Sequence, residues 1–186
     1  IIVHYEMTLQ DPSNTENKST YNFVLIANRE MSIFADTAAH NYYNNTKSPE
    51  LRILHTTLPR SRTSVFKYGK KTTTYLPILY DMFSYEEPNL EWELIPGETK
   101  KFNNYTCYLA KTKSKEERIY YAWYYPEVSI PEGPYRFKGL PGLILEAYSE
   151  DKAVVFSALG MKKTDEKIEK INYLSVIHMK DKKEFI

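Results

Sequence analysis

Acidic residues in the second half of the chain are the first candidates for chemistry. Glu132, Glu146, Glu150 and Asp151 lie close together in the sequence. Because two carboxylates can divide general acid and base roles, one hypothesis is a hydrolase-like site built from Glu146, Glu132 and a histidine. Glu146 stands in an apolar stretch, where burial would raise its pKa and require a partner such as Arg136. The alternative is that Glu146 lies on a solvated outer face of a strand.

Histidine and cysteine offer little for a metal site or a nucleophile. His4, His40, His55 and His178 are scattered, without the close spacing of a metal-binding motif. We expect no metal and no cofactor. Cys107 is the only cysteine, so no intramolecular disulfide can form, and we predict that it is a small buried hydrophobic residue.

Aromatic residues alternate along residues 119–125, and they offer a different kind of site. Tyr121 and Trp123 share one face of the predicted strand, and Tyr120 and Tyr124 share the other. Such a strand either packs between two layers or lines a cavity that would suit an apolar or amphipathic ligand. The predicted binding surface comprises Trp123, Tyr135, Phe137, Tyr121 and Arg136.

The most distinctive motif is Gly139-Leu140-Pro141-Gly142-Leu143-Ile144. Pro141 and Gly142 fit the two central positions of a type II turn, because proline fixes φ at the first and glycine accepts positive φ at the second. Leu143 and Ile144 then lead into the core. The motif is therefore predicted to be either a structural corner between strands or a binding loop.

The same hexapeptide, Gly-Leu-Pro-Gly-Leu-Ile, names the GLPGLI proteins of Bacteroidetes, and the chain resembles that family over residues 92–160. Residues 133–137 resemble the Gly-Pro-aromatic-x-Phe lead that precedes the family motif. Residues 105–107, 122–124 and 126–131 resemble its upstream pattern. The resemblance implies export, with the signal removed, to the periplasm or the cell surface. It implies no activity.

The order of the predicted elements is also loosely similar to that of periplasmic lipoprotein carriers. Those proteins have a bent antiparallel sheet with an aromatic or apolar concave face. This resemblance implies a curved sheet and an apolar ligand, and it assigns no residue.

The elements that must position these residues are mainly strands, because the apolar spacing has period two. Strands are predicted at residues 3–9, 21–27, 31–34, 62–68, 72–79, 92–94, 105–109, 119–125, 143–148 and 153–159. Gly69 marks one hairpin, and residues 149–152 mark another between two central strands. Pro96-Gly97 is predicted to end the strand that precedes it.

Four stretches do not alternate. Residues 10–19 are rich in turn-forming side chains and predict a break, and residues 36–50 predict an irregular loop. Residues 81–87 predict a short helical turn or a loop. Near the end, residues 168–174 have helical spacing and residues 173–179 fit a strand, while Asp181 could cap a short last helix.

Composition limits the fold and the partners. The 186 residues suit a single domain, residues 1–186, and 17 Tyr and 8 Phe favour sheet. We predict a mainly β fold, with α+β as the alternative: a curved antiparallel sheet of seven or more strands and one or two short helices. The net charge of +1 gives no reason to expect nucleic acid or an anionic membrane, and no apolar run could span a bilayer.

Together these features predict an extracytoplasmic protein that binds an apolar ligand or an envelope protein without catalysis. The carboxylate-centred enzyme is one alternative. The other is a scaffold subunit that has no pocket and offers its strand edges or a flat aromatic surface to a partner.

Overall fold

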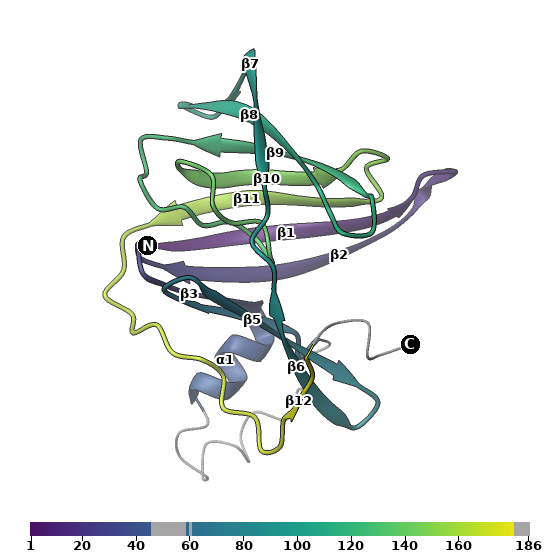
Figure 1. Cartoon of the computed structure of the whole chain (residues 1–186), viewed down its shortest axis with the longest axis vertical. Coiled ribbons are helices and arrows are strands. Elements are labelled where there is room, and N and C mark those ends of the chain that lie inside the picture. The colour runs from purple at the N-terminus through teal and green to yellow at the C-terminus, as the bar shows by residue number, and fades with distance from the viewer. Residues whose placement is uncertain (46–58, 60, 181–186) are drawn as a thin grey trace.

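A computed structural model describes residues 1–45, 59 and 61–180 (Figure 1). In these residues, twelve strands form one sheet, accompanied by a single α-helix. The strands are β1 (Ile2–Asp11), β2 (Asn14–Ala27), β3 (Met31–Asp36), β4 (Ser64–Tyr68), β5 (Lys71–Ile78), β6 (Asp81–Glu87), β7 (Trp92–Phe102), β8 (Tyr105–Lys113), β9 (Ile119–Tyr125), β10 (Leu143–Ser149), β11 (Val154–Lys162) and β12 (Ile177–His178), and the helix is α1 (Thr37–Asn45).

The strands lie in the order β12-β6-β5-β4-β3-β2-β1-β11-β10-β9-β8-β7. All neighbours are antiparallel except β12 and β6, which pair in parallel. The first strand lies in the middle, where it joins the β2–β6 meander to the β7–β11 meander through β11. The predicted mainly β fold is confirmed, with more than seven strands and one short helix.

One face of the sheet carries the main core, and we call it the inner face. The segment 126–142, between β9 and β10, covers it. Phe137 from this segment packs against Tyr120 and Phe156, with ring centroids 5.2 and 6.1 Å apart. Tyr5 is fully buried on β1, and its hydroxyl donates a hydrogen bond of 2.5 Å to the Ile144 carbonyl.

The connection between β6 and β7 crosses the molecule. These strands follow one another along the chain but lie near opposite ends of the sheet, and residues 88–91 link them across the inner face (Figure 1). Trp92 Nε1 donates to the Lys138 carbonyl at 2.8 Å, which ties the link to the covering segment. The Glu91 carbonyl accepts a bond of 2.6 Å from the Thr112 hydroxyl, which anchors the link to β8.

The predicted irregular loop at 36–50 is wrong for residues 37–45, which form α1. Asp36 caps this helix, because its Oδ1 accepts the Ala39 N–H at 3.0 Å. Residues 46–50 of the predicted loop lie outside the described residues. The prediction for 81–87 is also wrong, since these residues form β6 and pair along their length with β5.

Two predicted interruptions of the strands are wrong as well. The break at 10–19 is a tight hairpin, since β1 runs to Asp11 and β2 begins at Asn14. Pro96 and Gly97 interrupt β7 without ending it. They lie in a register shift between Ile95 and Thr99, where the extra residues leave the β8 ladder and Gly97 adopts φ of +83°.

The predicted helix at 168–174 does not form, and of the predicted strand at 173–179 only β12 does. Residues 163–176 instead run without regular secondary structure along the half of the sheet that carries α1 (Figure 1). Tyr173 secures them, because its hydroxyl donates to the Arg62 carbonyl at 2.6 Å and lies 2.9 Å from Ser64 Oγ. The predicted cap at Asp181 lies outside the described residues.

The turn in the motif differs from the type II prediction. The Gly142 N–H donates to the Leu140 carbonyl at 2.8 Å, which closes a three-residue γ-turn around Pro141. Gly142 has φ of 158°, far from the roughly +80° of a type II turn. Glycine is required for another reason. A Cβ atom at this position would lie 2.4 Å from the Tyr125 carbonyl oxygen, so the two backbones touch.

Candidate functional site

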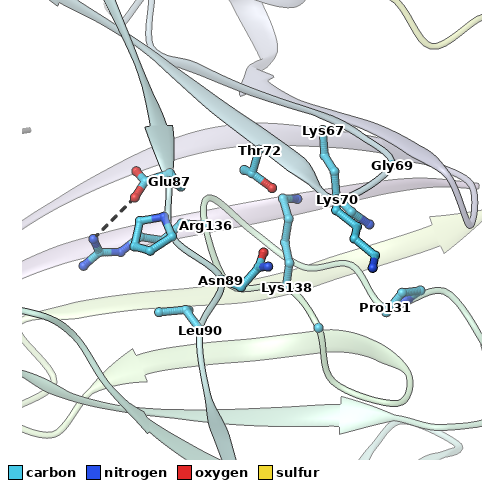
Figure 2. A pocket seen from close by; sticks show the side chains of 12 residues that line it. Lys67, Gly69, Lys70, Thr72, Glu87, Asn89, Leu90, Pro131, Arg136 and Lys138 are labelled. Carbon is cyan, nitrogen blue, oxygen red and sulfur yellow. Dashed lines mark ion pairs between the residues drawn. The ribbon is translucent and has the colours of Figure 1, made fainter. Parts of the chain in front are cut away.

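A cavity of about 380 Å³ opens on the inner face between the sheet, the 88–91 link and the covering segment (Figure 2). Its walls come from the β4–β5 hairpin, the end of β6 and the stretch 131–139. Its lining is rich in charged and hydrogen-bonding side chains. The lining residues are Lys67, Gly69, Lys70, Thr72, Glu87, Pro88, Asn89, Leu90, Pro131, Arg136, Lys138 and Gly139.

The β4–β5 hairpin places three of the polar groups together. Lys67 and Thr72 are direct cross-strand partners, and Lys70 lies in the turn between their strands. The turn is fixed from outside, because the Gly69 N–H donates to the Glu30 carbonyl at 2.9 Å. Lys70 is exposed and makes no ion pair with the residues that the structure describes.

Behind the cavity wall lies a buried ionic cluster centred on Glu132, which is fully buried. Lys67 Nζ donates to Glu132 Oε1 at 2.5 Å, and Lys138 Nζ donates to Oε2 at 2.6 Å. The Ser32 hydroxyl also donates to Oε2, at 2.8 Å, and accepts from Lys138 at 3.2 Å. A carboxylate without partners could not be accommodated at such a depth, so the lysines and the glutamate require one another.

In this cluster, the neighbouring opposite charges shift each pKa in the direction opposite to the shift caused by burial. Burial would raise the pKa of Glu132, but Lys138 and Lys67 outweigh it and hold the pKa below its usual value. Burial lowers the pKa of Lys138, and the adjacent Glu132 opposes that shift. The carboxylate is therefore ionised at neutral pH and keeps both ammonium groups in place.

The motif positions this glutamate. The Ile144 N–H donates to the Glu132 carbonyl at 2.9 Å, and the Gly139 N–H donates to the Pro131 carbonyl at 3.0 Å. A Cβ atom on Gly133 would lie 2.7 Å from the Ile144 Cβ, so only glycine permits this contact. The motif and its Gly-Pro lead thus form a corner that brings Glu132 under β3 and β4.

The other end of the cavity holds Arg136 and Glu87. Their closest charged atoms are 3.8 Å apart, and both side chains are largely buried. Glu87 also accepts a hydrogen bond of 2.8 Å from the Thr74 hydroxyl. In Figure 2 the guanidinium group points towards Glu87 and away from the lysines, so the cavity has a lysine end and an arginine end.

Of the five residues in the predicted binding surface, Arg136 lines the cavity. Phe137 belongs to the core, and Tyr135 is half-buried beside Arg136, with its backbone at φ of +51°. Tyr121 and Trp123 lie on the outer face of the sheet. Tyr121 stacks there on Tyr148, and Trp123 is buried, with Lys100 Nζ 5.8 Å from its ring centroid. The structure therefore separates the predicted surface into three places.

The two carboxylates of the hydrolase hypothesis have separate cationic partners. Glu146 pairs with Lys100 at 3.0 Å, not with Arg136, and it is half-buried on the outer face. His40 contacts Asn44 and Glu166, and His178 Nδ1 lies 2.7 Å from Ser84 Oγ. His55 lies outside the described residues. Nothing in the described ranges joins Glu132, Glu146 and a histidine.

Cys107 is fully buried, as predicted, and burial raises its pKa to about 11. In residues 1–45, 59 and 61–180, no three His, Cys, Asp or Glu side chains gather closely enough to hold a metal ion. In the same part of the chain, no helix is long and apolar enough to cross a bilayer.

Sequence reasoning missed the lysines of the cavity. Lys67 and Glu132 are 65 residues apart, so no local pattern joins them. Lys138 lies only six residues from Glu132, but Arg136 is nearer still, so the local sequence does not show which cation pairs with this carboxylate.

The model of a family described as "Protein of unknown function (Porph_ging)" matches residues 111–146 of this chain, which include the whole motif. That description assigns no activity. Comparison with curated protein sequences finds no match.

Among solved structures, PNGF-II in space group P21 is similar over 99% of this chain, with a TM-score of 0.67 and 13% identity. The C2 form of PNGF-II gives 0.66 and 13% over 96% of this chain and 30% of that one. This chain spans about a third of PNGF-II, 32% of its length in the P21 form. At this identity the likeness concerns the fold alone.

Two weaker matches are an uncharacterized conserved protein from Thermus thermophilus and a LolA superfamily protein from Nitrosomonas europaea. The first has a TM-score of 0.44 and 9% identity over 95% of this chain and 90% of that chain. The second has a TM-score of 0.35 and 9% identity over 89% and 86%.

Proposed function

We propose that this chain is a non-enzymatic binding protein of the cell envelope and that its ligand occupies the inner-face cavity. The observation that carries the proposal is the cavity itself. Its volume of about 380 Å³ is that of a small-molecule site, and rigid strands and a buried ionic cluster hold its polar lining in place. The lining favours a polar ligand over the apolar one predicted from the aromatic strand.

The envelope location and the GLPGLI assignment belong to the same proposal. The motif and its lead support the assignment, and the family match at residues 111–146 covers both. An exported protein of this family would meet its ligand in the periplasm or at the cell surface.

Binding is favoured over hydrolysis by the state of the carboxylates. A general acid or base must reach a substrate with a proton to exchange. Glu132 has no exposed surface and is neutralised by lysines. Glu146 is held by Lys100 on the other face of the sheet.

A partner-binding scaffold is the second candidate, and one observation favours it. Leu79 and Tyr80 form the tip of the β5–β6 hairpin with 88% and 96% of their surfaces exposed. Neighbouring large apolar side chains that are both exposed offer surface that a partner protein would bury.

Native mass spectrometry of protein purified gently from its own host tests the proposal. The wild type should carry a bound small molecule, and extraction should identify it. Asn89→Trp should lose that molecule, because the indole would narrow the cavity without changing the charge. Asn104→Trp, in the exposed turn between β7 and β8, is the matched control and should retain it.

An empty wild type would contradict the proposal, and so would a ligand that Asn89→Trp retains, because that ligand would lie elsewhere. A stable complex with another protein, without a small molecule, would support the scaffold instead.

A further inference from the structure

The lysine end of the cavity consists of Lys67, Lys70 and Lys138, and its charges do not balance. Glu132 is the only carboxylate among the described residues within ion-pair distance of these lysines. Three ammonium groups beside one carboxylate leave two positive charges. At the other end, Arg136 lies 3.8 Å from Glu87 and 4.0 Å from the more exposed Glu116, so its charge is compensated there. The excess charge is therefore confined to the lysine end.

The lysine end also has hydrogen-bond donors that have no acceptor among the described residues. An ammonium group has three N–H donors. Lys138 uses two, on Glu132 and Ser32, and Lys67 uses one, on Glu132. Lys70 uses none with the described residues. Lys67 and Lys138 are largely buried, so their spare donors face the cavity or remain unsatisfied.

We propose that the lysine end of this cavity binds the dianionic group of a small polar ligand, either a phosphate monoester or a pair of carboxylates. This inference rests on the proposed function and names the ligand class for the same site. A dianion matches the two uncompensated charges, and its oxygens accept the spare donors.

Glu132 acts in this site as a positioning residue. Lysine is flexible, and three lysines that repelled one another would not hold one arrangement. Glu132 fixes Lys67 and Lys138 through both carboxylate oxygens, while the hairpin turn fixes the backbone of Lys70. The lysine side chains therefore lose their conformational entropy when the protein folds, and binding does not have to order them.

Backbone amide shifts during titration at pH 7 test the inference. The probes are inorganic phosphate, malonate as the dicarboxylate, acetate as the monoanion and sucrose as the neutral compound. Phosphate or malonate should shift the amides of Gly69, Thr72 and Gly139 saturably, and acetate and sucrose should not. A response to phosphate alone indicates a phosphate monoester, and a response to malonate alone indicates two carboxylates.

Two pairs of variants distinguish dianion binding at this site from a general effect of surface charge on affinity. Lys70→Gln should weaken dianion binding about threefold, as expected for loss of an exposed ion pair. Lys71→Gln removes the same charge from the neighbouring residue, which pairs with Glu86 and does not line the cavity, and should leave affinity unchanged. Asn89→Asp adds a negative charge to the cavity and should weaken binding further, whereas Asn104→Asp should have no effect.

Equal affinity in Lys70→Gln and Lys71→Gln would overturn the inference, and so would the absence of saturable shifts with both dianions. The proposed function would still stand if the host-purified protein carried a neutral molecule that Asn89→Trp displaces. Both would fail if the host-purified protein were empty and neither dianion bound.

Discussion

At the scale of single residues, Glu132 has the greatest effect on the candidate site. It joins β3, β4 and the covering segment through Ser32, Lys67 and Lys138. The sequence could not reveal this role, because the partners lie up to 100 residues away. It singled out Glu146 as the odd carboxylate, while the fully buried one stands in a proline-rich stretch with no strand pattern to mark it.

Glu132→Gln should lower the free energy of unfolding by about 3 kcal/mol at pH 7, because it leaves two buried ammonium groups without a counter-charge. The pKa of Glu132 is lowered in the fold. Its contribution is therefore present above the unfolded pKa of about 4.3 and is lost as pH falls through the folded value. Urea unfolding between pH 3 and 7 should show the gap to wild type narrowing in acid.

Glu98→Gln serves as the control, since Glu98 is exposed on β7, and its unfolding should follow the wild type at each pH. A gap for Glu132→Gln that stays constant down to pH 3 would contradict the ionised state of this carboxylate.

Gly142→Ala should lower the free energy of unfolding by more than about 1 kcal/mol, as is usual for overpacking. The added methyl group would meet the Tyr125 carbonyl and the Pro126 Cα at 2.4 and 2.7 Å. Gly160→Ala has open space around it and should be neutral or slightly stabilising. Thermal unfolding of both variants checks this, and a wild-type melting temperature for Gly142→Ala would rule out the backbone contact.

At the scale of elements, sequence patterns succeeded where each strand alternates against a neighbour close in the chain. The β4–β5 and β10–β11 hairpins are such cases. The pattern failed for β6, because Ser84 and Glu87 are buried in it as polar residues. Their hydrogen-bond partners are His178 and Thr74, which lie on other strands, and the local sequence does not identify them.

At the tip of the β5–β6 hairpin, the residue type suits neither the backbone conformation nor the solvent exposure. Leu79 adopts φ of +54°, a conformation that costs a non-glycine residue about 1–2 kcal/mol. Leu79→Gly should raise the free energy of unfolding by roughly 0.5–1 kcal/mol, because the exposed side chain contributes no packing and glycine adopts this conformation without the steric cost. Chemical denaturation measures the change.

Leu174→Gly is the matched control, since Leu174 is fully exposed and lies outside the left-handed region. It should be neutral or slightly destabilising. Lower stability of Leu79→Gly than of Leu174→Gly would show that the tip is packed.

At the scale of the whole molecule, the position of β1 decides how the two meanders are joined. Ile2 pairs with Ile26 on one side and with Lys162 on the other, so the junction with β11 joins residues 160 positions apart. The sequence predicted the strands on both sides of this junction but not their order in the sheet. The alternation of apolar residues within a strand does not identify which strands pair with it. That the chain forms one domain stays a prediction.

Native-state hydrogen exchange should report this arrangement. Amides of β1, β2, β10 and β11 should be the most protected, since these strands are paired on both sides and lie centrally. Amides of β7 and β12, at the two ends of the sheet, should exchange first. Equal or greater protection of β7 and β12 would contradict the sheet order.

The 88–91 link has a geometric consequence for the sheet as a whole. Ten strand-to-strand steps separate β6 from β7, about 48 Å along the sheet at the usual spacing of neighbouring strands. The backbone from Glu87 to Trp92 has five Cα–Cα steps and reaches at most about 19 Å. The sheet is therefore an arc and the link is its chord. The chain cannot flatten without breaking the pairing of one end strand, and the space between arc and chord is limited by the length of four residues.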